Sequence, residues 1–142
     1  MKVLKFGGTS VANSESLSHV IEILKTSSEK QIVVVSALSG ITNSLVQMAE
    51  KASAGEAGFQ AGIASIEERH LNLILHFIPV TNQSEDISFL KARLNSLEEL
   101  LESVHTLREL TPKSLAKVSS YGDILSSRII YKILKYHGLD YE

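Results

Sequence analysis

Along the 142 residues, apolar side chains form short runs near the N-terminus and then recur at helical spacing over long segments. Lys2–Phe6 alternates between polar and apolar residues and leads into two glycines, a pattern typical of a strand that enters a tight turn. Residues 12–28 carry apolar side chains every three or four positions, which predicts a helix with Asn13 or Ser14 as its N-cap. Gln31–Ser36 is rich in β-branched residues without interruption, as in parallel strands covered on both faces. The three segments predict a right-handed βαβ unit.

The rest of the chain has helical spacing. Pro79 disfavours helix in the residue before it, Pro112 suits a first helical turn, and Gly138 suits a C-terminal cap. The two middle helices are long enough to form a hairpin. We expect these helices over about residues 45–55, 59–77, 87–110 and 112–136.

The last residues, Leu139–Glu142, have the pattern of a strand beginning. Two parallel strands cannot cover the apolar faces of about five helices, and a buried strand needs partners on both sides. We therefore predict an α/β fold in which residues 1–142 are the N-terminal portion of one larger, incomplete domain.

Composition excludes several classes of function. Hydrophobic residues make up 44% of the chain, which predicts a packed globular core. A net charge of −2 and only 6% aromatic residues leave little material for a nucleic-acid surface. The absence of cysteine excludes disulfides and thiolate metal sites. With no apolar run of about 18 residues and no signal-peptide pattern, the expected compartment is the cytoplasm and no membrane partner is expected.

Two strand-to-helix junctions carry the candidate chemistry. In Lys5–Ser10, Gly7 and Gly8 allow close backbone approach and Lys5 adds a positive charge, which suits a phosphate. The segment matches neither GxxxxGK[ST] nor GxGxxG. From the residues alone, a phosphate cradle and a tight turn with a solvated lysine both remain open.

The second junction follows the second predicted strand. Ser36, Ser39, Thr42 and Asn43 offer hydroxyl and amide groups there, although the same residue types are common in ordinary turns. Carboxyl ends of parallel strands meet at one sheet edge, where ligands bind. Both junctions are therefore expected to face one crevice.

Three segments together form a pattern that is specific enough to indicate a protein family: Val3–Ala12, Val33–Asn43 and Ser120–Ser126. They resemble the N-terminal part of the aspartokinases, which are members of the amino-acid kinase family. The opening and the helical insert look most similar to the bifunctional aspartokinase–homoserine dehydrogenases. The resemblance implies an αβα sandwich with a mainly parallel sheet, of which this chain is a helix-rich, truncated N-terminal portion.

The resemblance also implies a reaction: phosphorylation of the L-aspartate β-carboxylate by ATP with Mg²⁺, giving 4-phospho-L-aspartate. This would be the first step of lysine, threonine and methionine biosynthesis. By position, Lys5 matches the lysine that contacts the transferring phosphoryl group. Gly7, Gly8 and Ser10 match positions beside the ATP phosphates, while Ser36 matches a hydroxyl that lines the substrate pocket.

Two further substrate positions follow from the resemblance. Thr42 matches a second hydroxyl of the substrate pocket, and Asp123 stands where the family has a glutamate that holds the amino group of aspartate. Aspartate is one methylene shorter, so it needs a backbone shift or a bridging water, or it binds more weakly. The family elements for Mg²⁺, adenine and the α-carboxylate have no counterpart here, so we expect the fragment alone to be inactive. The resemblance also leads us to expect a homo-oligomer for the full-length protein.

Other functions stay open. Glutamate 5-kinase and acetylglutamate kinase are alternatives within the family. Glu67 with His70 and Glu102 with His105 show the Glu-x-x-His spacing of di-iron bundles, but Glu102 points away from the apolar stripe of its helix, so no metal site is expected. The leucine stripe of residues 87–110 could be a non-catalytic partner-binding face, although packing on a neighbouring helix is the simpler interpretation.

Overall fold

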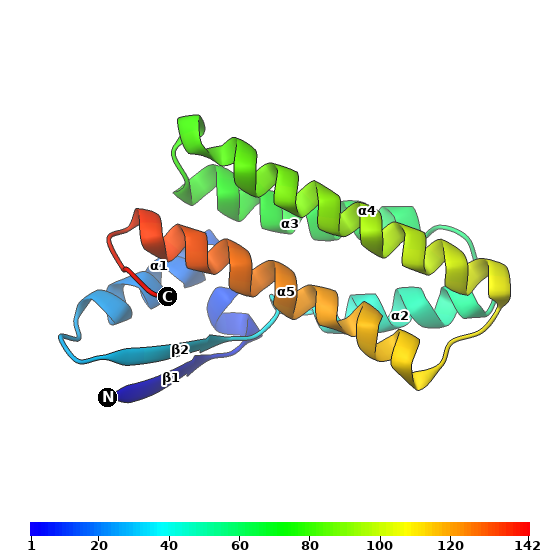
Figure 1. Cartoon of the computed structure of the whole chain (residues 1–142), viewed down its shortest axis with the longest axis horizontal. Coiled ribbons are helices and arrows are strands. Elements are labelled where there is room, and N and C mark those ends of the chain that lie inside the picture. Colours follow the sequence, from blue (N-terminus) through cyan, green and yellow to red (C-terminus); the bar gives the residue numbers. More distant parts are fainter.

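The computed structural model describes residues 1–142 and contains a two-stranded sheet and five α-helices (Figure 1). The elements in chain order are β1 (Lys2–Phe6), the 3₁₀ turn η1 (Gly8–Val11), α1 (Ser14–Lys25), β2 (Gln31–Val35), α2 (Ile41–Ser53), α3 (Phe59–Phe77), the 3₁₀ turn η2 (Val80–Asn82), α4 (Gln83–Leu107) and α5 (Pro112–Tyr136). None of these helices is both long and apolar enough to cross a membrane.

The two strands are parallel, with α1 as the connection between them. Lys2 pairs with Gln31 and Phe6 with Val35, so the strands end side by side. The predicted βαβ arrangement of strand, helix and parallel strand is therefore confirmed. Its consequence for function is that the loops after β1 and β2 start next to each other.

Only one face of this sheet packs against the core. Leu4 and Val33 are half-buried against it, whereas Val3, Ile32 and Val34 are exposed on the other face. The expectation that the second strand is covered on both faces is wrong for these 142 residues. The β-branched run indicated a strand correctly, but it did not determine how many layers cover the strand.

The helix α5 lies at the centre of the helical part. It contacts α2, α3, α4 and β2, and in Figure 1 it runs between the strands and the α3–α4 hairpin. The leucine stripe of α4 is buried in the same core, through Leu90, Leu94, Leu97, Leu101 and Val104. This stripe packs within the chain, as the simpler interpretation of the sequence had it.

The helix bounds differ from the sequence pattern at the start of α2, which begins at Ile41 and not near residue 45, in α4 and at the chain end. The helix α4 begins at Gln83, whose side chain donates a 2.8 Å hydrogen bond to the carbonyl of Ile78, and it stops before Arg108, whose φ of 54° is left-handed. Residues 139–142 form no strand. Instead, the Tyr141 hydroxyl donates to Oε1 of Gln31 at 2.7 Å, which holds the chain end beside the start of β2.

Candidate functional site

The loops that follow β1 and β2 touch each other through their backbones. The N–H of Ser39 donates to the carbonyl of Gly8 at 3.1 Å. A Cβ added to Gly8 would lie 2.8 Å from the carbonyl oxygen of Ala37, closer than real Cβ contacts come. The two junctions therefore lie in direct contact, as a shared crevice would require, and the absence of a side chain at Gly8 allows this contact.

Both loops lead into helical turns whose first N–H groups have no side-chain acceptor. Gly7 precedes η1 and Gly40 precedes α2, and neither position supplies a capping side chain. The space beside Gly7 is open, because a Cβ there would meet no atom within 4 Å. Uncapped N–H groups at two adjacent turns can donate to a bound anion.

Four polar side chains at these loops have no hydrogen-bond or ion-pair partner within the chain. Lys5 is exposed near the end of β1 and takes part in none of the five ion pairs of the structure. Ser10 and Ser36 are half-buried, and Thr42 is exposed in the first turn of α2. These groups are available to a ligand at the crevice.

Asp123 reaches the second loop from α5. Its Oδ1 accepts a 3.0 Å hydrogen bond from the N–H of Ala37, across 86 positions of sequence. The preceding Gly122 lies against the same residue, since a Cβ there would be 2.9 Å from the Cβ of Ala37. The structure thus brings Asp123 to the loop that also carries Ser36, with one carboxylate oxygen used by the protein itself.

Sequence reasoning missed Arg69 on α3. Its guanidinium donates to the carbonyl of Ser39 through Nη1 and to that of Ala12 through Nη2, the second bond at 3.2 Å. Both acceptors are backbone atoms, which no residue-type motif reveals. The only signal in the sequence was an arginine next to the apolar stripe of its helix.

The Glu-x-x-His pairs have other partners. Glu67 forms an ion pair with Lys91, and Nδ1 of His70 bonds the Ile66 carbonyl at 2.7 Å. Nε2 of His105 bonds the Gly55 carbonyl at 3.2 Å. No three acidic or histidine side chains are grouped closely enough to hold a metal ion.

His70 is completely buried. Its Nε2 has no hydrogen-bond partner, and desolvation lowers its pKa from 6.5 to about 4. A histidine of this kind is neutral at pH 7 and belongs to the core.

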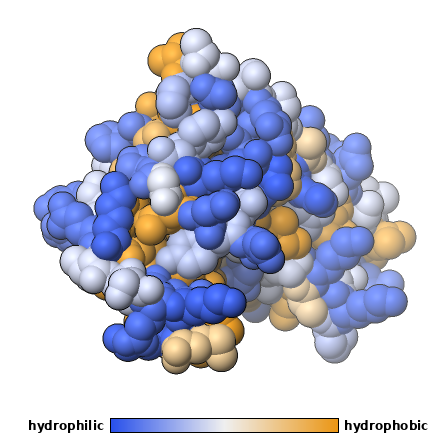
Figure 2. Space-filling view, turned by 60° about the vertical axis from the view of Figure 1, so that its left-hand side comes forward, coloured by the Kyte–Doolittle hydropathy of each residue, from blue (hydrophilic) through white to orange (hydrophobic).

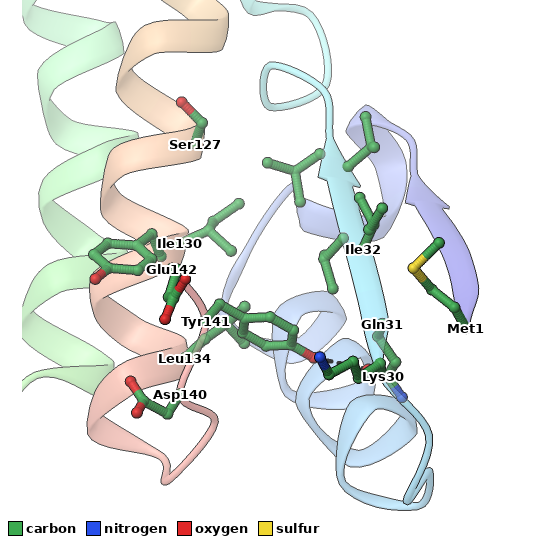
Figure 3. Close-up of a pocket in the computed structure, with 14 residues that line it drawn as sticks. Met1, Lys30, Gln31, Ile32, Ser127, Ile130, Leu134, Asp140, Tyr141 and Glu142 are labelled. Carbon is green, nitrogen blue, oxygen red and sulfur yellow. Dashed lines mark hydrogen bonds between the residues drawn. The ribbon is translucent and has the colours of Figure 1, made fainter.

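A separate cavity lies elsewhere. It has a volume of about 760 Å³ and follows the free edge of β2, opposite Ser127, Ile130 and Leu134 of α5 (Figure 3). Tyr141 lies at its side, bonded to Gln31. On the side of the molecule that holds both termini, apolar patches interrupt a mostly hydrophilic surface (Figure 2). Because no candidate site residue lines this cavity, it is a separate feature from the crevice.

Comparison with known proteins identifies a family and several related sequences. The model of the amino acid kinase family matches residues 1–142. Chloroplastic aspartokinase 1 of Arabidopsis thaliana is 34% identical over 141 residues, which are 96% of this chain and 24% of that protein. The bifunctional aspartokinase/homoserine dehydrogenase of Buchnera aphidicola is 31% identical over 140 residues, 95% of this chain and 17% of that protein. The chain therefore spans about a quarter of these relatives or less.

The fold agrees as well. The crystal structure of E. coli aspartokinase III in complex with aspartate and ADP matches with a TM-score of 0.85 at 24% identity, covering 97% of this chain and 29% of that one. The expectation of an αβα kinase-type fragment with a small parallel sheet is confirmed by this match. Since the family model covers the full length and the fold agrees, the chain belongs to the amino acid kinase family.

Proposed function

We propose that these residues form the phosphate-binding and substrate-facing part of an ATP-dependent aspartate kinase. The reaction transfers the γ-phosphoryl group of ATP to the β-carboxylate of L-aspartate, giving ADP and 4-phospho-L-aspartate, the first step of aspartate-derived amino-acid biosynthesis. The observation that carries the proposal is the backbone contact between Gly8 and Ser39, which joins a loop suited to phosphate to a loop rich in hydroxyl groups. L-aspartate is proposed as the substrate because the relatives are aspartokinases.

The residue types suit this chemistry. A carboxylate with a pKa of about 4 is already ionised at pH 7, so the transfer needs no general base. Catalysis then depends on position and on stabilising the charge that spreads over the phosphoryl oxygens. The unpaired ammonium of Lys5 and the uncapped N–H groups after Gly7 are the donors available for that task.

Each candidate residue then has a role. Gly7, Gly8 and Ser10 would border the ATP phosphates. Ser36 and Thr42 would line the aspartate pocket with hydroxyl groups.

Asp123 would hold the amino group of aspartate through its second carboxylate oxygen. The first oxygen is engaged by Ala37, so the shorter side chain is anchored to the loop that it serves. This anchoring offers a physical reason why aspartate could work in place of the family's glutamate.

The proposal includes ATP but assigns no ligand for Mg²⁺ within these residues. No three acidic or histidine side chains lie close together, and Mg²⁺ in such sites is held largely by the phosphates of the nucleotide and by water. The isolated 142 residues are accordingly expected to be inactive.

The test is a lysine substitution in the full-length kinase that carries this segment. We expect Lys5→Ala to lower kcat on the order of 10²-fold or more, because one donor to the transferring group is lost. Lys2→Ala is the matched control, since Lys2 lies at the other end of β1 and pairs only with Glu29 at the surface, at 3.3 Å. Near-normal turnover by the Lys5 variant would remove Lys5 from the mechanism.

The substrate is tested separately. The wild-type kinase should turn over L-aspartate in preference to L-glutamate and N-acetyl-L-glutamate. Preference for either of the other two acids would replace the proposed function with glutamate 5-kinase or acetylglutamate kinase activity.

A further inference from the structure

Arg69 is the only side chain that bonds both loops of the crevice. It extends from α3 and is half-buried. Nη1 donates to Ser39 in the loop after β2, and Nη2 donates to Ala12, which directly follows η1 in the loop after β1. A planar guanidinium presents its donors in a fixed fork, so it can hold two acceptors at a set separation.

In the loop after β2, both backbone polar groups of Ser39 are hydrogen-bonded. The N–H of Ser39 bonds to Gly8 and its carbonyl bonds to Arg69. Two residues earlier, Ala37 is held by Asp123. Removing Arg69 would leave the Gly8 bond as the direct hydrogen-bonded link between the loops, and would leave two half-buried backbone carbonyls without their charged donor.

The charge of Arg69 is also unbalanced. It forms no ion pair, although the neighbouring Glu67 is paired with Lys91. Its positive charge is one of the causes that lower the pKa of the adjacent, buried His70. The guanidinium is therefore committed to backbone carbonyls of the crevice and not to a structural salt bridge.

We propose that Arg69 is a positioning residue for phosphoryl transfer: it sets the separation between the phosphate-side loop and the substrate-side loop. This inference rests on the proposed function. Each loop could still bind its own ligand without Arg69, but the reacting atoms would be less well aligned. Misplacement by about 1 Å can cost on the order of 10²-fold in rate.

The kinetic test uses the full-length kinase with Arg69→Met and Arg69→Lys. Arg69→Met should lower kcat about 10²-fold, while KM for ATP and KM for aspartate each change less than about threefold. Arg69→Lys should recover at least about tenfold of the loss, because an ammonium can donate to the same carbonyls without the fork. Arg93→Met is the control, since Arg93 is exposed on α4 and lies over the Phe89 ring, away from the crevice.

A second readout does not depend on activity. Hydrogen exchange measured by mass spectrometry should show residues 36–40 exchanging at least about tenfold faster in Arg69→Met, with α4 and α5 unchanged. If kcat stays normal, or if residues 36–40 stay protected, the positioning role is wrong. Faster exchange throughout the helices would also overturn it, because Arg69 would then act on global stability.

The two proposals fail in different ways. A wild-type kinase without activity on aspartate would refute the proposed function, and the exchange experiment would still decide whether Arg69 couples the loops. An active wild type with an unaffected Arg69→Met would refute only the positioning role.

Discussion

Gly7 and Gly8 are neighbours in sequence, yet only one of them has room for a side chain. A Cβ on Gly8 would meet backbone atoms of Ala37 and Ser39 at 2.8 and 3.1 Å, and backbone cannot move aside cheaply. Gly8→Ala should therefore lower the free energy of unfolding by about 1–3 kcal/mol. Gly7→Ala should change it little, because a Cβ there is unopposed. Urea unfolding of both variants checks this, and equal effects would contradict the crowding at Gly8.

Single residues were predictable from sequence to different degrees. Lys5 lies near the end of a predicted strand and the two glycines form the turn after it, so local pattern was enough to single them out. Asp123 was found only through a family resemblance, because its partner Ala37 is distant in sequence. Arg69 was missed because it bonds to backbone carbonyls, which look the same at every residue.

His70 gives the chain a pH dependence of stability. Its pKa is about 4 in the folded state against 6.5 for an exposed histidine, because burial disfavours the charged form. The unfolded chain therefore binds more protons between these values, and the free energy of unfolding falls as the pH drops from about 6.5 to 4. The loss is at most about 3 kcal/mol. Denaturant titrations at a series of pH values measure it.

His70→Leu is the comparison for this pH effect. It removes the titrating group, so the difference in unfolding free energy between wild type and variant should depend on pH between 6.5 and 4. Buried Asp86 has a raised pKa and acts in the opposite direction, but it is common to both proteins and cancels in the difference. Parallel pH profiles would show that His70 does not cause the loss.

At the scale of elements, the start of α5 depends on one cap. The Thr111 hydroxyl accepts a 3.0 Å hydrogen bond from the N–H of Ser114, with Pro112 in the first turn. Thr111→Ala should lower the free energy of unfolding by about 1 kcal/mol, measured by urea unfolding. Thr106→Ala is the matched control, because Thr106 is exposed inside α4, where alanine is the better helix former. Similar losses in both would mean that the cap contributes nothing.

Element types were easier to predict than element ends. The end of α3 followed from Pro79, and the bounds of α5 followed from Pro112 and Gly138, since these residues act locally. The early start of α4 could not be predicted, because it depends on the Gln83 side chain reaching back to Ile78. The left-handed backbone conformation of Arg108, at the other end of α4, has no sequence signature.

At the scale of the whole molecule, the sheet has an exposed apolar face. Val3, Ile32 and Val34 are 65%, 48% and 42% exposed. We expect this 142-residue chain to self-associate at micromolar concentration through the sheet. The double variant Ile32→Thr, Val34→Thr should lower the mass seen by light scattering. Val80→Thr, exposed in η2, should not, and an unchanged mass in the double variant would exclude this face.

The contact between Asp123 and Ala37 also has a consequence in time. Ribosomes add about 5–20 residues per second, so the 86 positions between these two residues take roughly 4–17 s to synthesise. Throughout that interval the nascent chain has both strands and both glycine loops, but not the helix that closes them. The contact between these loops and α5 therefore forms late, and a ribosome that paused before α5 would leave both loops exposed to chaperones and proteases.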